Sequence, residues 1–81
     1  MTITLLFFAR ARDLAGTDRA SFPLTEGARV ADLRTRLVEQ YPALQPLADK
    51  LLVAVNAEYA DDGTPIPAGA EVAVFPPVSG G

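Results

Sequence analysis

The chain has 81 residues, and its seven Lys and Arg against ten Asp and Glu give a formal net charge of −3. It contains no Cys and no His, which excludes a disulfide framework, a Cys–His metal centre, a Cys nucleophile and a His general base. The length predicts one domain. From the composition we expect no metal site, and a chain without Cys and His is a poor candidate for a self-sufficient enzyme.

The charge distribution also limits the classes of partner. An acidic chain with scattered cations lacks the basic stripe that nucleic-acid binding usually requires, and it is unsuited to anionic membrane surfaces. The apolar start, residues 1–9, is too short to cross a bilayer, which takes about 20 apolar residues. We therefore expect a cytoplasmic protein that binds neither nucleic acid nor membrane.

The first part of the chain predicts two strands. Residues 2–8 are rich in β-formers, and residues 18–24 alternate apolar and polar side chains. Residues 9–17 between them are polar and mixed, with a short turn predicted at residues 13–17. Because Pro23 has no N–H to donate to a neighbouring strand, we expect the second strand at an edge of the sheet.

A helix is expected next, over residues 30–40. One apolar stripe recurs there at helical spacing, formed by Val30, Leu33 and Leu37. Arg29 is a poor N-cap, which Asp32 in the first turn partly offsets, and Pro42 ends the helix. A single helical turn is expected within residues 43–49.

Two further strands complete the predicted fold. Residues 51–56 are nearly all apolar, as in a buried strand, and residues 71–75 form the last strand after turn signals at 61–63. If the first and last strands pair in parallel, the middle of the chain is the crossover that they need. The order β, β, α, β, β predicts an α+β fold of the ubiquitin-like β-grasp type, a mixed sheet with one main helix across it.

The last residues read as a tail. We expect a domain over residues 1–75 and a flexible tail over residues 76–81, made of Pro76, Pro77, Val78, Ser79, Gly80 and Gly81. Two terminal glycines carry no side chains and can thread a narrow channel. The alternative is an ordinary frayed terminus.

The chemistry that such a tail supports follows from its carboxylate. With a reference pKa of about 3.3–3.7, the α-carboxyl of Gly81 is ionised at neutral pH and is a poor electrophile. An activating enzyme would have to convert it with ATP into an acyl-adenylate, from which a sulfur nucleophile could displace AMP and leave a thiocarboxylate. The chain would then be a carrier that binds no permanent cofactor.

At this point the sequence resembles a known family, the small subunits of molybdopterin synthase, which are ubiquitin-like sulfur carriers. The resemblance covers nearly the whole chain, and its most specific part is the ending, Glu71-Val72-Ala73-Val74-Phe75-Pro76-Pro77-Val78-Ser79-Gly80-Gly81. The other matching segments are Leu6-Phe7-Phe8-Ala9, Asp13-Leu14-Ala15-Gly16 and Leu51-Leu52-Val53-Ala54-Val55-Asn56.

The resemblance implies a set of partners. A ubiquitin-activating-like adenylyltransferase would adenylate Gly81, and a sulfurtransferase would supply the sulfur. The tail would then enter the large subunit, where sulfur passes to cyclic pyranopterin monophosphate to form molybdopterin. Two small and two large subunits would make a heterotetramer, with the catalytic groups on the large subunit.

An independent prediction comes from strand alternation. Phe8 faces opposite to Phe7, and Phe75 faces opposite to Val72 and Val74. If the alternate set contacts the helix, Phe8 and Phe75 share the other face and form an aromatic docking site at the root of the tail. The alternative is that loops cover both rings. The resemblance adds Tyr59 as a third, weaker contact, at a position that the family often fills with an aliphatic residue.

Other functions remain open at this stage. Within the same chemistry, the chain could carry sulfur for thiamine or tRNA thiolation. From other classes, it could be a ubiquitin-like protein modifier joined through Gly81 to lysines, or a binding module with an inert tail. The ending Phe-Pro-Pro-Val-Ser-Gly-Gly and the length favour the molybdopterin carrier.

Overall fold

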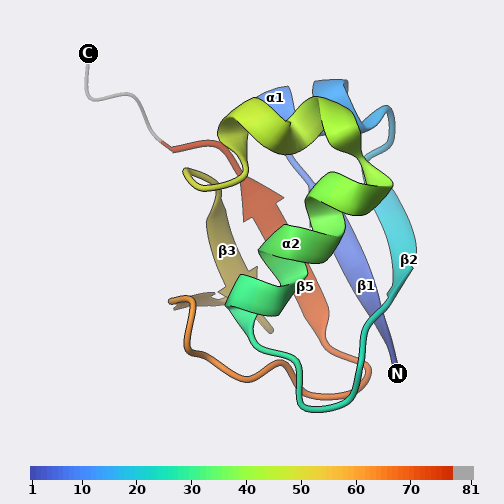
Figure 1. The fold of residues 1–81 in the computed structure, drawn as a ribbon, viewed down its shortest axis with the longest axis vertical. Helices are drawn as coiled ribbons and strands as arrows, with labels where there is room; N and C mark the ends of the chain where they lie inside the picture. Colours follow the sequence, from blue (N-terminus) through green and yellow to red (C-terminus); the bar gives the residue numbers. More distant parts are fainter. Residues whose placement is uncertain (78–81) are drawn as a thin grey trace.

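A mixed five-stranded sheet forms the body of the protein in a computed structural model that describes residues 1–77 (Figure 1). The strands are β1 (Thr2–Phe7), β2 (Arg19–Pro23), β3 (Leu52–Val55), β4 (Glu58–Ala60) and β5 (Glu71–Phe75). They lie in the order β2-β1-β5-β3-β4, with β1 and β5 parallel and the other neighbours antiparallel. This confirms the α+β prediction of the ubiquitin-like type, the parallel pairing of the first and last strands, and the edge position of the strand that contains Pro23.

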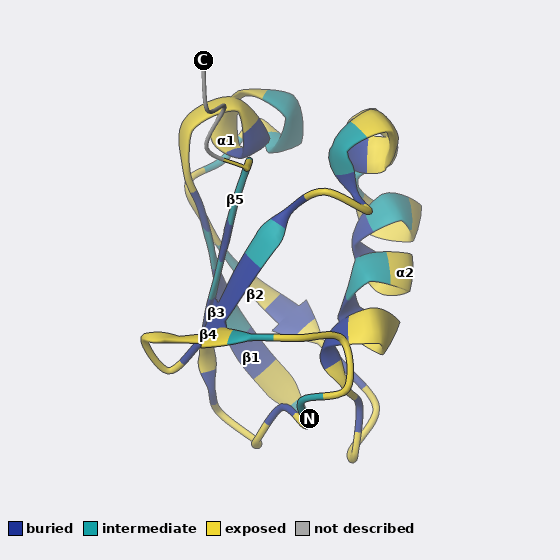
Figure 2. Ribbon diagram, turned by 90° about the vertical axis from the view of Figure 1, so that its left-hand side faces the viewer, coloured by how far each residue is buried: buried dark blue, intermediate teal, exposed yellow. Residues whose placement is uncertain are grey.

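The helix α2 (Val30–Gln40) lies across one face of the sheet and buries the core against it (Figures 1 and 2). Its predicted apolar stripe, Val30, Leu33 and Leu37, is fully buried. The alternate side chains of β1 and β5 that meet it are at most 1% exposed: Ile3, Leu5, Phe7, Val72 and Val74. Because each large apolar side chain contributes about 1.5–3 kcal/mol when buried, this layer pair supplies the main stabilisation of the fold.

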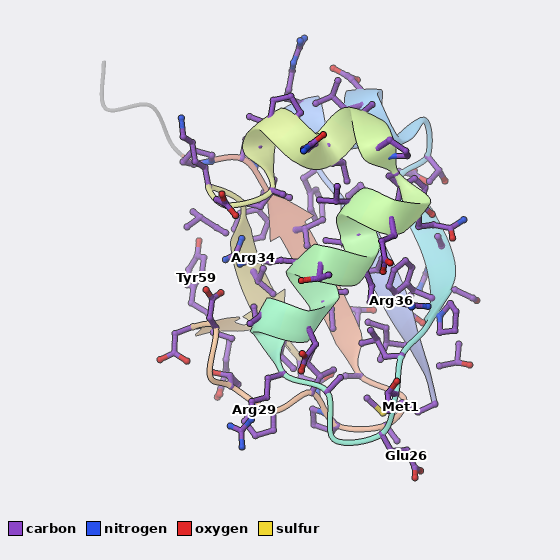
Figure 3. The ribbon with its side chains drawn as sticks, in the orientation of Figure 1. Met1, Glu26, Arg29, Arg34, Arg36 and Tyr59 are labelled. Atoms are coloured by element: carbon purple, nitrogen blue, oxygen red, sulfur yellow. The ribbon has the colours of Figure 1, made fainter. Side chains whose placement is uncertain are left out.

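Two arginines tie α2 to the loop over residues 61–64 (Figure 3). Arg29 donates from its Nη1 to the carbonyl of Gly63 at 2.6 Å. Arg34 pairs through its Nε with Asp62 at 2.7 Å and also donates to the carbonyl of Ala48 at 2.6 Å. Arg34 therefore joins three segments that are distant in sequence.

The sequence predicted no helix within residues 9–17 and only a short turn at 13–17, but the helix α1 (Ala9–Ala15) lies there. Its inner side is formed by Ala11, which is fully buried, and by the half-buried Leu14 and Ala15. These three positions have helical spacing, but only one of them is a large apolar residue. Gly16, with φ 79°, ends the helix and donates its N–H to the carbonyl of Arg12.

The sequence also predicted four strands, and the structure adds a fifth, β4. This strand pairs with β3 in a hairpin, and neither an apolar run nor alternation marks its three residues. The short turn expected within residues 43–49 is a 3₁₀ helix, η1 (Pro42–Leu47). No helix in the described part of the chain is both long and apolar enough to span a membrane.

Candidate functional site

The face of the sheet opposite α2 is open. Within residues 1–77 no helix lies over it, whereas α2 covers the other face (Figure 2). Side chains that alternate with the core set lie on this open sheet face, and its apolar members are Leu6, Leu52, Ala54, Tyr59, Ala73 and Phe75. Their register places Ala73 opposite both Leu6 and Ala54, so the surface is continuous from β1 to β4. Toward β2 the same face carries an ion pair between Arg19, which lies opposite Leu6, and Glu71, at 4.0 Å. The part around Ala73 and Phe75 is apolar and has the composition of an interface core.

Three aromatic rings gather at one part of this face. Phe75 lies between Phe8 and Tyr59, with ring centroids 6.1 Å and 5.7 Å away and both contacts edge-on. Phe8 is 48% exposed and Tyr59 is 76% exposed, and among the described residues these are the exposed large hydrophobic side chains. We call Phe8, Tyr59 and Phe75 the aromatic triad. The predicted juxtaposition of Phe8 and Phe75 is confirmed, and the described loops do not cover Phe8.

The backbone that carries Phe8 differs from the prediction. β1 ends at Phe7, and Phe8 is the N-cap of α1 in an extended conformation, with φ −124° and ψ 151°. Its N–H still donates to the carbonyl of Val74 at 3.2 Å, so Phe8 continues the pairing with β5 for one more residue. The side chain therefore lies where strand alternation predicted, although the strand has ended.

Tyr59 reaches the triad from β4, at the far edge of the sheet from β2. It pairs with Ala54 of β3, while Phe75 pairs with Leu52, which lies two residues earlier on β3 and on the same face. Figure 3 shows its side chain projecting outward from this edge, away from α2. Sequence reasoning could not place Tyr59 because β4 was not predicted, and only the family resemblance pointed to it.

The tail begins directly beside the triad. β5 ends at Phe75, followed by the half-buried Pro76 and the exposed Pro77. The remaining predicted tail residues, Val78, Ser79, Gly80 and Gly81, lie outside the described residues. The root of the tail is thus attached to the central ring of the triad.

No three His, Cys, Asp or Glu side chains within residues 1–77 are grouped so that they could hold a metal ion. A shallow hollow of about 400 Å³ lies between the loop over residues 24–28 and the start of α2, lined in part by Glu26, Asp32 and Arg36. It belongs to a different part of the fold from the triad and contains no member of it.

Comparison with known proteins agrees with this geometry. The model of the ThiS family matches residues 5–81. The molybdopterin synthase sulfur carrier subunit of Chlamydomonas reinhardtii is 37% identical over 83 residues, covering 100% of both chains. The subunit of the same name from Escherichia coli is 42% identical over 85 residues, covering 98% of this chain and 99% of its own.

Solved structures show the same relation. A putative molybdopterin converting factor subunit 1 from Pyrococcus furiosus has a TM-score of 0.87 at 32% identity, covering 96% of this chain and 99% of its own. Small archaeal modifier protein 1 from Haloferax volcanii has a TM-score of 0.84 at 32% identity, covering 95% and 98%. A complex of subunits 1 and 2 of molybdopterin-converting factor from Helicobacter pylori contains a chain with the same fold, with a TM-score of 0.71 at 23% identity over 100% of both chains. With a family match over residues 5–81 and relatives above 30% identity along their whole length, the chain belongs to the ThiS family.

Proposed function

We propose that the chain is the sulfur-carrier subunit of molybdopterin synthase and acts in molybdenum cofactor biosynthesis. The observation that carries this proposal is the end-to-end match to relatives of that name. For one of them the match covers 100% of both chains. The lack of Cys and His supports a carrier that is not itself catalytic, because the chain has no thiol and no imidazole with which to perform the transfer.

The reaction would take place at the carboxylate of Gly81. An adenylyltransferase joins this carboxylate to the AMP of ATP and releases pyrophosphate. Sulfur from a sulfurtransferase then attacks the acyl carbon and AMP leaves. Sulfur delivered as hydrosulfide gives the thiocarboxylate directly, whereas a persulfide gives an acyl disulfide, from which a second thiol releases the thiocarboxylate by supplying two electrons and becoming a disulfide. In the large subunit this sulfur passes to cyclic pyranopterin monophosphate, and water restores the carboxylate. ATP is thus consumed by the activating enzyme, and the carrier holds no permanent cofactor.

The open sheet face would dock on the large subunit of the synthase. Its support is the aromatic triad, since exposed aromatic rings beside small apolar side chains are typical of the centre of an interface. Gly81 lies six residues after Phe75 and can reach about 20 Å from the docked surface, at roughly 3.3–3.6 Å per residue. Docking would therefore place Gly81 within reach of a site on the large subunit near the docked surface. Two carriers would flank a large-subunit dimer.

Intact-mass measurement tests the carrier function. The purified chain is incubated with ATP, a cognate adenylyltransferase and a sulfur donor, and we expect the mass to rise by the replacement of one oxygen by one sulfur. A chain without Gly81 is the matched control and should keep its fold but stay unloaded. No mass gain by the complete chain, with an enzyme that loads another carrier of the family, would reject the proposal.

A second candidate is a protein modifier, because a structural neighbour of 32% identity bears that name. In that case a lysine amine, instead of sulfur, would attack the activated Gly81 and form an isopeptide bond. The two functions differ in product. Adding the large subunit and cyclic pyranopterin monophosphate to the loaded carrier should yield molybdopterin if the first proposal holds. Covalent adducts on other proteins, without molybdopterin, would favour the modifier, and transfer of sulfur only to a thiamine precursor or tRNA would favour those pathways.

A further inference from the structure

Among the described residues, left-handed backbone outside glycine is found at two sites, each close to a member of the aromatic triad in the sequence. Within residues 1–77 it occurs at Ala9, with φ 51°, and in a pair formed by Asn56, with φ 49°, and Ala57, with φ 70°. Ala9 directly follows Phe8, and Ala57 lies two residues before Tyr59. At the other left-handed positions that the structure describes, the residue is glycine. Since the Cβ of an alanine crowds the following carbonyl in this conformation, both alanines are strained.

Ala9 turns the chain between two fixed points. On one side, the N–H of Phe8 donates to the carbonyl of Val74, as in a strand. On the other, the carbonyl of Phe8 accepts the N–H groups of Ala11 and Arg12 at 3.1 Å and 3.3 Å, and Ala11 is fully buried. The left-handed residue between β1 and α1 therefore fixes the backbone of Phe8 at the end of the sheet, with its ring against Phe75.

The second strained site fixes Tyr59 in a comparable way. Asn56 and Ala57 form a two-residue hairpin with positive φ at both positions, as in a type I′ turn. Asn56 clamps this turn to β5, because its N–H donates to the carbonyl of Glu71 at 2.8 Å and its Oδ1 accepts the N–H of Glu71 at 3.0 Å. The turn sets the register that places Tyr59 opposite Ala54, and so its ring against Phe75.

We propose that Ala9 and Ala57 are positioning residues, whose left-handed backbone holds Phe8 and Tyr59 against Phe75 so that the triad is formed before the partner docks. This inference rests on the docking role proposed above. A glycine at either position would relieve the crowding but would also allow a wider range of backbone conformations. The exposed ring would then occupy several positions in the free chain, and docking would have to order it.

The test compares Ala9→Gly and Ala57→Gly with Ala31→Gly, which makes the same change at an exposed site in α2 remote from the triad. We expect both triad variants to be at least as stable to urea as the unchanged chain. We also expect each to bind the large subunit about two- to tenfold more weakly. Ala31→Gly should show the reverse, a less stable fold with unchanged affinity.

A second measurement makes the inference independent of the partner. In the free chain, nuclear Overhauser contacts between the rings of Phe8 and Phe75 should weaken in Ala9→Gly, and those between Tyr59 and Phe75 in Ala57→Gly. Unchanged ring contacts in both variants, or unchanged affinity with a partner that Phe75→Ala weakens, would overturn the inference. If Phe75→Ala itself leaves the affinity unchanged, the docking proposal fails instead, and the ring contacts alone decide whether the alanines position the triad.

Discussion

Replacement of Tyr59 by alanine should separate docking from folding more cleanly than any other change on the open sheet face. Tyr59 is 76% exposed. An aromatic side chain buries about 150–250 Å² when it is fully covered, so roughly 110–190 Å² of Tyr59 is left for a partner to cover. At about 25 cal/mol per Å², this area is equivalent to about 3–5 kcal/mol. Ordering of the side chain and incomplete coverage reduce the expected loss of binding free energy to about 2–3 kcal/mol.

The expected effect on the fold is smaller. Tyr59 lies on the edge strand β4, and within residues 1–77 its one aromatic neighbour is Phe75. Loss of that contact removes about 0.5–1.5 kcal/mol from the free energy of unfolding. Affinity should therefore fall further than stability does, by roughly 30- to 150-fold in Kd.

Calorimetric titration of the large subunit measures the change in affinity, and urea unfolding of the same samples measures stability. Glu58→Ala is the matched control, because Glu58 is an exposed neighbour on the same strand whose side chain alternates to the other side of the sheet. It should leave the affinity unchanged. If Tyr59→Ala folds normally and weakens binding by less than about threefold, the partner does not cover this ring, and the docking surface has been assigned wrongly.

Three other substitutions test the fold that presents this surface. Leu33→Ala, at a fully buried position of α2, should lower the free energy of unfolding by about 2–5 kcal/mol, and a loss much below this range in urea unfolding would mean that α2 does not pack as described. Gly16→Ala should lower the free energy of unfolding by about 1 kcal/mol through backbone conformation alone, because a Cβ there meets no atom within 4 Å. A neutral result in thermal unfolding would refute the left-handed end of α1. Arg34→Met should lower the free energy of unfolding by about 1–2 kcal/mol, since this change removes both the hydrogen bond to Ala48 and the ion pair with Asp62. Asp62→Asn, which removes only the ion pair, should lower the free energy of unfolding by less than about 1 kcal/mol. Equal effects in urea unfolding would show that the bond to Ala48 contributes nothing.

The parts of the fold that were predictable from sequence are those in which burial imposes a period. The stripe of α2 has apolar residues at Val30, Leu33 and Leu37, and the helix has the predicted bounds. β1 and β5 alternate clearly enough to show which side chains face the helix. In each case one face of the element is buried against a large layer, so the sequence carries a strong and repeated signal.

The elements that escaped prediction are short and contribute little apolar area. α1 spans seven residues, and its one fully buried side chain is Ala11, which is too small to stand out among the neighbouring charges. β4 spans three residues, and its hairpin turn is Asn56-Ala57, where the usual signal would be Asn-Gly. Their positions are determined by tertiary contacts and by left-handed residues that propensity does not favour.

This contrast also explains which site residues could be found. Phe8 and Phe75 belong to, or directly follow, strands with a clear period of two, so their common face was predictable although Phe8 lies one residue beyond β1. Tyr59 lies on a strand that no pattern marks. The triad therefore combines two rings that the sequence places by alternation with one ring that only the folded hairpin brings to the same surface.

The separation of core and site follows from the same topology. α2 buries one face of the sheet and provides most of the stabilisation, which leaves the other face free to be selected for binding. On that face Phe75 is both the centre of the triad and the last residue of β5 before the tail. A partner that covers Phe75 therefore fixes the point from which the tail starts. For a chain without Cys or His, whose proposed reactive group is a carboxylate six residues further on, control over that starting point is the main contribution that the folded domain can make to the chemistry.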